Sequence, residues 1–137
     1  MMGLLILIFV FLGSIHVYWA FGGQWAADTV LPTNSAGKRM LNPSTLMTLV
    51  VSIGLFAFAM YYMVVAGWIH FYLPSWLQLL AGWGIPSIFL LRVIGDFQYV
   101  GLFKKITQSE FAQADSRYFV PLCLGIAILG FFLKIFP

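Results

Sequence analysis

Two charged residues stand four positions apart in an otherwise apolar stretch, "LLRVIGDFQYVG", at residues 90–101. On a helix, Arg92 and Asp96 would share one face, where an ion pair between them lowers the free energy needed to bury either charge. Tyr99 continues that face. Because the planar guanidinium of an arginine binds carboxylates and anionic headgroups, the stretch predicts a binding site. The alternative interpretation is a structural pair that extends toward the membrane surface and fixes the position of the helix.

His16 is a second candidate, in the N-terminal apolar segment. It shares a helical stripe with the small residues Gly13, Ala20 and Gly23, and such stripes are typical of close helix contacts in membranes. The histidine is therefore expected to face other helices rather than lipid. It could relay a proton, bond to Asp96, or connect two helices by a hydrogen bond, and the sequence leaves these roles open.

Three more polar or aromatic residues are candidates for the same membrane boundary. Trp19 and Gln24 flank the glycines at positions 22 and 23, which allow a sharp turn where the first helix ends. Asp115 brings a carboxylate to this boundary, although capping of the last helix explains it equally well. These side chains could complete a polar pocket around His16 and Arg92.

Cofactor and metal chemistry have little basis in the sequence. The single cysteine, Cys123, excludes an internal disulfide and a multi-cysteine metal site. A haem held by two histidines is not expected, because His16 falls near the cytoplasmic end of the first helix and His70 near the outward end of the second, at different depths in the membrane. No nucleotide-binding, hydrolase or zinc-protease motif occurs. We predict no cofactor and no metal, and no class of enzyme can be assigned.

The composition indicates an integral membrane protein. Apolar residues make up 62% of the 137 residues, only 8% are charged, and the mean hydropathy is +0.98. The net charge of +3 does not indicate a nucleic-acid partner, because the seven Lys and Arg residues are scattered and form no basic stripe. Any function must therefore reside in the helices or at their ends.

Four segments are long and apolar enough to cross a bilayer, which needs about 20 residues per helix. They cover approximately residues 3–22, 45–71, 76–103 and 118–136. The predicted fold is all-α, a single integral-membrane domain over residues 1–137 that forms a four-transmembrane-helix bundle with short loops.

The third predicted helix contains a proline, Pro86, a turn and a half before Arg92. A proline inside a helix removes one backbone hydrogen bond, so it should kink the helix or free a carbonyl near the charged pair.

The basic residues predict the orientation of the chain. Apart from Arg92, which lies within the third apolar segment, the chain has six basic residues. Only Lys134 among them stands on the side of the two termini. The others occupy the first and third loops and their borders: Lys38, Arg39, Lys104, Lys105 and Arg117. The positive-inside rule then predicts that these two loops are cytoplasmic and that both termini face outward.

Three segments carry a family resemblance: "HVYWAFGGQW" at 16–25, "LRVIGDFQYVGLFKK" at 91–105 and "FAQADSRYFVPLCL" at 111–124. Together they resemble the bacterial membrane family known as domain of unknown function 3995. The resemblance implies a small multi-spanning protein of a bacterial inner membrane and supplies no activity. It also implies a recurring polar signature at His16, Trp19, Gly22, Gly23, Arg92, Gly95, Asp96, Asp115, Tyr118 and Pro121.

Three functions fit these features. The first is binding of a lipid or a small anionic molecule in a cytoplasmic-side pocket, with Arg92 holding the anion and His16 or Asp96 moving a proton. The second is a proton-coupled transporter, for which a homo-oligomer is the simplest form. The third is a non-catalytic membrane stabilising or immunity factor. Membrane lipids are expected partners in each case. Whether His16, Arg92 and Asp96 converge on a cavity would separate the three functions.

Overall fold

The computed structural model describes residues 1–32, 36, 38, 43–95 and 100–137. Every regular element among these residues is a helix, which confirms the predicted all-α class. The elements are α1 (Met2–Ala20), α2 (Ala27–Val30), α3 (Thr45–Val65), α4 (Ser75–Ile94), α5 (Glu110–Ala114), the π-helix η1 (Asp115–Phe119) and α6 (Val120–Ile135).

Four helical segments are long and apolar enough to cross a membrane. These are Met2–Ala20, Thr45–Val65, Ser75–Ile94 and Glu110–Ile135, the last being α5, η1 and α6 in continuous succession. The chain therefore has the helices of a multi-pass membrane protein.

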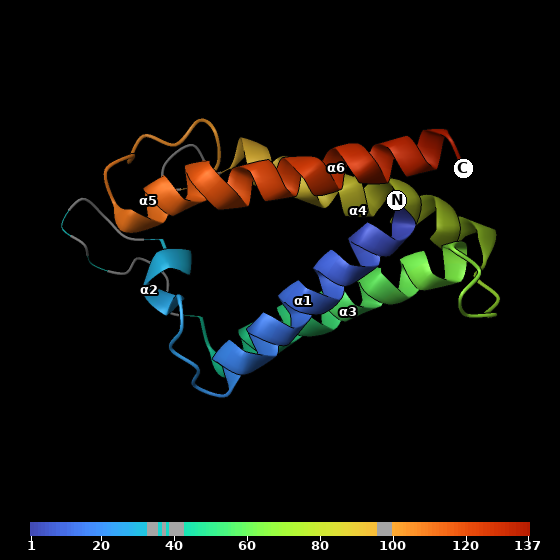
Figure 1. The fold of residues 1–137 in the computed structure, drawn as a ribbon, viewed down its shortest axis with the longest axis horizontal. Helices are drawn as coiled ribbons and strands as arrows, with labels where there is room; N and C mark the ends of the chain where they lie inside the picture. The colour runs from blue at the N-terminus through green and yellow to red at the C-terminus, as the bar shows by residue number, and fades with distance from the viewer. Residues whose placement is uncertain (33–35, 37, 39–42, 96–99) are drawn as a thin grey trace.

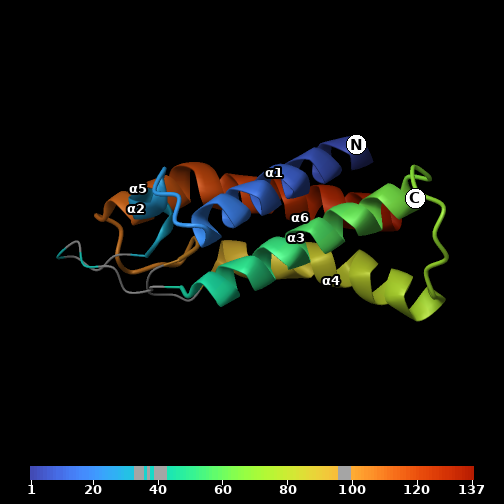
Figure 2. The ribbon, with the colours of Figure 1, turned by 90° about the horizontal axis from the view of Figure 1, so that it is seen from below.

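The four long helices form two antiparallel pairs. Figures 1 and 2 show α1 lying along α3 and α4 lying along α6. The pairs meet at the end of the molecule where both termini lie, and they separate toward the end that carries α2 and α5 (Figure 1). The predicted bundle is thus two helix pairs joined mainly at one end.

The core that joins the pairs is built around Phe9 of α1, which is fully buried. Its ring centroid lies 5.7 Å from that of Phe58 and 5.9 Å from that of Tyr62, both on α3. On its other side it lies 5.5 Å from the ring of Phe89 on α4. Aromatic rings at such spacings add to the stability gained from burial, so this cluster holds the two pairs together.

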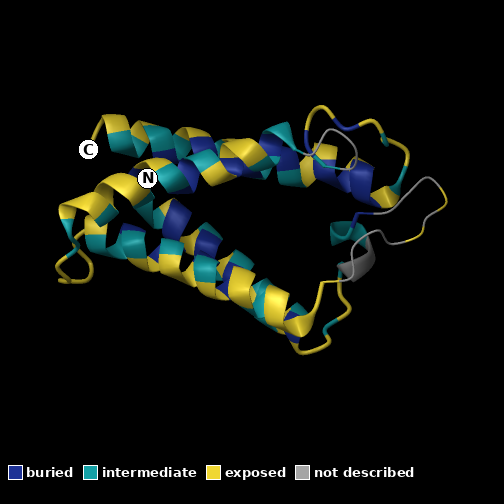
Figure 3. Ribbon diagram, turned by 180° about the vertical axis from the view of Figure 1, so that it is seen from behind, coloured by how far each residue is buried: buried dark blue, intermediate teal, exposed yellow. Residues whose placement is uncertain are grey.

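The outward faces of the long helices remain exposed, as Figure 3 shows. Many of their side chains are large and apolar, among them Leu7 and Phe11 on α1 and Val50 and Ile53 on α3. A surface of this kind is disfavoured in water but suits contact with lipid chains.

Two helices end earlier than the sequence predicted. The second ends at Val65 rather than near residue 71, and a turn at Gly67, with φ of 75°, follows it. The third ends at Ile94 rather than near residue 103, because Gly95 adopts a φ of 81°. That conformation strains residues with a side chain, which makes glycine suited to end a helix there.

The fourth helical segment begins earlier than predicted, at Glu110 rather than near residue 118. Its N-cap is Ser109, whose hydroxyl accepts a hydrogen bond from the Ala112 N–H at 3.1 Å. The expectation that Asp115 caps this helix was therefore wrong. Asp115 lies within the helical segment, and its side chain is free to bond elsewhere.

Candidate functional site

The carboxylate of Asp115 is completely buried and lies between two cations. Arg92 of α4 reaches it with Nη2, 2.7 Å from Oδ1. Lys104, which follows α4 in the chain, reaches it with Nζ, 2.9 Å from Oδ2. Each carboxylate oxygen thus has its own positive partner, as a buried charge requires.

Backbone and hydroxyl groups complete the site. The Gly101 N–H donates to Oδ2 of Asp115 at 2.9 Å. The Lys104 ammonium also donates to the Gly101 carbonyl at 3.1 Å and to the Ser116 hydroxyl at 2.6 Å. A lysine ammonium has three donors, and all three of these have an acceptor. We refer to Arg92, Gly101, Lys104, Asp115 and Ser116 as the Asp115 cluster.

Two glycines bring the segment after α4 to Asp115. Gly95 and Gly101 have φ of 81° and 89°, and the two residues lie in direct backbone contact, since a Cβ on Gly101 would stand 2.6 Å from the Gly95 Cα. The Leu102 N–H donates to the Val93 carbonyl at 2.8 Å. Residues with a side chain could not approach this closely, so the glycines allow the chain to return to the end of α4.

A π-helix begins at Asp115. A π-helix is wider than an α-helix, and it occurs most often as a single turn at functional sites. Here it covers Asp115–Phe119, and Pro121 follows in the first turn of α6. In a regular α-helix the ring of this proline would clash with the carbonyl of Arg117, four residues earlier. The wide turn relieves that clash, which explains its position, and Asp115 is its first residue.

Arg92 is bound less completely than Lys104. Its side chain is 32% exposed, whereas that of Lys104 is 3% exposed. Among the described residues its Nη1 atom is buried and has no hydrogen-bond partner. Because the described cluster has two cations and one anion, it carries an excess of one positive charge, and Arg92 is the member with unused donors.

The structure brings together two of the predicted site residues, Arg92 and Asp115. Two others, Asp96 and Tyr99, lie outside the described residues, so their predicted pairing with Arg92 stays a prediction. Lys104 was not predicted as a site residue, because its charge was interpreted only as an orientation signal. The pair of glycines six residues apart, just before it, is the feature that could have indicated a tight return of the chain.

His16 does not belong to the Asp115 cluster. Its Nδ1 lies 2.7 Å from the Leu12 carbonyl of its own helix, and its ring packs against Trp19 at 5.1 Å. The carboxyl end of α1 lies on the helix pair opposite to α4 and α6, where the pairs have separated (Figure 1). Of the predicted small-residue stripe, Gly13 and Ala20 are buried and Gly23 is partly buried. The Ser52 hydroxyl of α3 donates to the Gly13 carbonyl at 2.9 Å.

Trp19 and Gln24 also lie away from the cluster. The Trp19 indole donates to the Trp25 carbonyl at 2.8 Å, and the Trp25 N–H donates to the Tyr18 hydroxyl at 3.4 Å. Gln24 is exposed between these residues. The aromatic residues stabilise the exit from α1, and this is the role that the described contacts give them.

One known protein family matches most of the chain. The model described as "Protein of unknown function (DUF3995)" matches residues 9–130. The chain belongs to the DUF3995 family. The resemblance carried by the three sequence segments is thereby confirmed, and the matched range of DUF3995 contains the whole Asp115 cluster. No curated protein and no solved structure matches the chain.

Proposed function

We propose that this DUF3995 protein is a multi-pass membrane protein that binds an anionic group, either a lipid headgroup or a small free anion, beside Arg92. The observation that supports the proposal is the uneven use of donors in the Asp115 cluster. Lys104 has three acceptors, whereas Arg92 is one-third exposed and its Nη1 has no partner among the described residues. A phosphate or carboxylate oxygen would satisfy that donor.

Asp115 would act as the positioning residue for this site. Its bond to Nη2 fixes one edge of the guanidinium, so the remaining donors are held in place before an anion arrives. A group fixed in advance loses less conformational entropy on binding. Asp96 and Tyr99 stay in the proposal as sequence neighbours of Arg92, while the contacts of His16, Trp19 and Gln24 support no part in it.

We also propose the cell membrane of a bacterium as the location, with the first and third loops in the cytoplasm. The resemblance to a bacterial membrane family supports this location, and the basic residues of those loops support this orientation. On this orientation the Asp115 cluster belongs to the cytoplasmic half of the protein, where anionic lipid headgroups attract basic side chains.

Binding measurements on the purified protein in a neutral detergent test the proposal. Native mass spectrometry with phosphatidylglycerol and titration with inorganic phosphate separate a lipid headgroup from a free anion. Replacing Arg92→Gln should weaken binding about tenfold, because a hydrogen bond to a charged group is lost. The matched control is Arg117→Gln, which removes an exposed arginine stacked on Tyr118 and should change affinity less than about twofold.

Equal weakening by both substitutions would indicate unspecific attraction and overturn the proposal, as would unchanged binding after Arg92→Gln. Thermal unfolding of each variant in the same detergent verifies that it folds. Arg92→Lys provides a second variant, which keeps the charge but not the planar fork and should restore only part of the affinity.

A non-catalytic stabilising factor is the second candidate, and one specific observation favours it. Asp115 is fully buried with both oxygens bonded, an arrangement that connects α4, the segment after it and the fourth helical segment without any ligand. The proton-coupled transporter has less support, because the contacts of His16 provide no connection to Asp115.

A further inference from the structure

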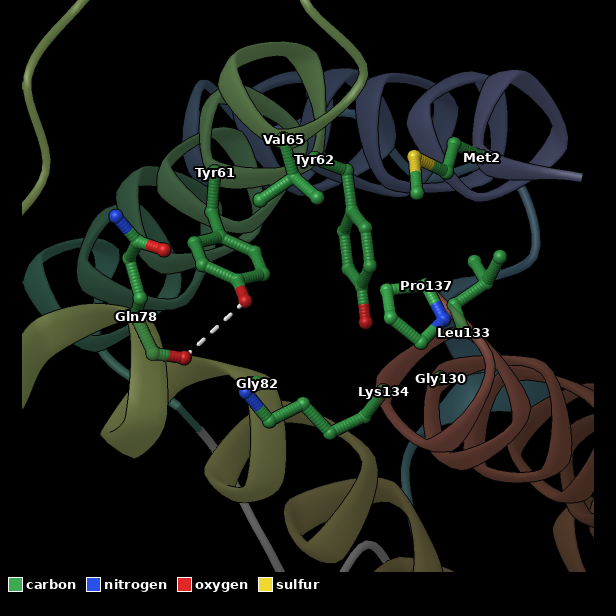
Figure 4. A pocket seen from close by; sticks show the side chains of 10 residues that line it. All are labelled: Met2, Tyr61, Tyr62, Val65, Gln78, Gly82, Gly130, Leu133, Lys134 and Pro137. Carbon is green, nitrogen blue, oxygen red and sulfur yellow. Dashed lines mark hydrogen bonds between the residues drawn. The ribbon is translucent and has the colours of Figure 1, made fainter. Parts of the chain in front are cut away.

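A cavity of about 190 Å³ lies between the two helix pairs at the end of the molecule where the termini lie. Figure 4 shows it, with side chains from α1, α3, α4 and α6 around it. This volume is large enough for several water molecules or for a small polar group. None of the sequence-predicted site residues lines it, and the α4 residues that do, Gln78 and Gly82, precede Arg92 of the Asp115 cluster by at least ten positions.

Two glycines make room for the polar groups of this cavity. A Cβ added to Gly82 of α4 would lie 2.9 Å from the Lys134 Cδ and 3.0 Å from the Tyr61 hydroxyl. A Cβ added to Gly130 of α6 would lie 3.1 Å from the Tyr62 hydroxyl. The absence of side chains at both positions therefore lets a lysine and two phenols enter the space between the pairs.

Each of these three polar groups can donate a hydrogen bond. The Lys134 side chain extends across α4 toward Tyr61 and Gln78, and the hydroxyl of Tyr62 points into the cavity (Figure 4). Tyr61 donates to the Gln78 carbonyl at 3.3 Å. Among the described residues neither the Lys134 ammonium nor the Tyr62 hydroxyl has a hydrogen-bond partner. The Tyr62 hydroxyl therefore has a hydrogen bond to offer to a group that enters the cavity.

No carboxylate side chain is available to Lys134 within the cavity lining. The chain has four acidic residues, at positions 28, 96, 110 and 115, and all of them belong to the first and third loops or to the segments next to them. Lys134 stands at the other end of its helix, one residue before α6 ends. Among the described residues it therefore has no acidic side chain as a counter-charge.

We infer that this cavity binds the oxyanion of an amphiphile, with Lys134 neutralising the charge and Tyr62 donating a hydrogen bond to it. Val65 and Leu133 add apolar surface beside these two residues, which suits the carbon chain next to a headgroup. The inference is independent of Arg92, since the two sets of residues share no member. The protein would then hold one anionic group near each membrane surface.

Native mass spectrometry of the full chain in neutral detergent tests this inference with phosphatidylglycerol, and titration with inorganic phosphate tests a free anion. Lys134→Gln should weaken phosphatidylglycerol binding at this site about tenfold, and Tyr62→Phe, which removes only a hydroxyl, should weaken it about threefold. Lys105→Gln is the matched control, because it removes an exposed lysine at the other end and should change affinity less than about twofold.

Two results would overturn the inference: unchanged binding after both Lys134→Gln and Tyr62→Phe, or an equal loss after Lys105→Gln. Binding of phosphatidylglycerol without binding of phosphate identifies a lipid site, and binding of both shows that the oxyanion alone suffices. Arg92→Gln should leave this site intact, so failure of the proposal for Arg92 and failure of the inference for Lys134 are distinguishable.

Discussion

The two ends of the helix framework treat a lysine in opposite ways. At one end, Lys104 is 3% exposed and donates to a carboxylate, a carbonyl and a hydroxyl. At the other end, Lys134 extends over Gly82 beside a cavity and has no carboxylate partner among the described residues. Both lysines depend on glycines for their positions. A cation near apolar helices is held in a structural role when the chain supplies its acceptors, and it stays available for an outside anion, as we infer for Lys134, when the chain does not.

The largest effect is expected from Asp115→Asn. This change leaves Arg92 and Lys104 without their counter-charge in a buried site, and breaking such a site costs about 3–5 kcal/mol of unfolding free energy. Unfolding by added dodecyl sulfate from a mild detergent measures it. Glu110→Gln, at an exposed acid five residues earlier, should cost less than about 1 kcal/mol. If both variants lose a similar, small amount of unfolding free energy, the Asp115 cluster does not stabilise the fold.

A smaller loss is expected from Gly95→Ala. Its φ of 81° disfavours alanine, and the added Cβ would meet the Val100 carbonyl, so the free energy of unfolding should fall by about 1–3 kcal/mol. Gly125→Ala is the control, because nothing lies within 4 Å of the added Cβ and the residue is helical. Alanine should be neutral or slightly stabilising there. If the two variants unfold alike, the return of the chain after α4 does not depend on Gly95.

The smallest effect is expected from Lys134→Met. With no acceptor to lose, removal of this ammonium should change the unfolding free energy by less than about 0.5 kcal/mol in detergent without lipid. The same change at Lys104 leaves Asp115 with one cation and should cost roughly 3 kcal/mol. The same unfolding assay compares the two. A large loss at Lys134 would remove the contrast between the two ends and make that lysine structural.

Some features of the site could be predicted from the sequence and others could not. Arg92 and Asp115 were identified as candidates because charges in apolar segments are costly and stand out. Their pairing was not predicted, because they are 23 positions apart and only the packing of α4 on the fourth helical segment brings them within 2.7 Å. Helical periodicity suggested a local partner for Arg92 and a continuous helix beyond Gly95, but α4 ends at Ile94.

The cavity near the termini was absent from the sequence prediction for a similar reason. Tyr61, Tyr62 and Lys134 stand on two helices that are far apart in the chain, and each is an ordinary residue for a membrane boundary. The importance of Gly82 and Gly130 also becomes clear only from the groups that approach them.

The sequence by itself determined the class of this protein: four apolar helices with short connections, and the places where charge interrupts them. It could do so because apolar length and the cost of burying a charge belong to single segments and do not depend on their neighbours. Tertiary structure alone decided which charges meet. Ion pairs and cavities require groups within a few ångströms of each other, and here those groups come from different helices. Among the described residues, Asp115 therefore acquired two cations and Lys134 acquired no carboxylate partner.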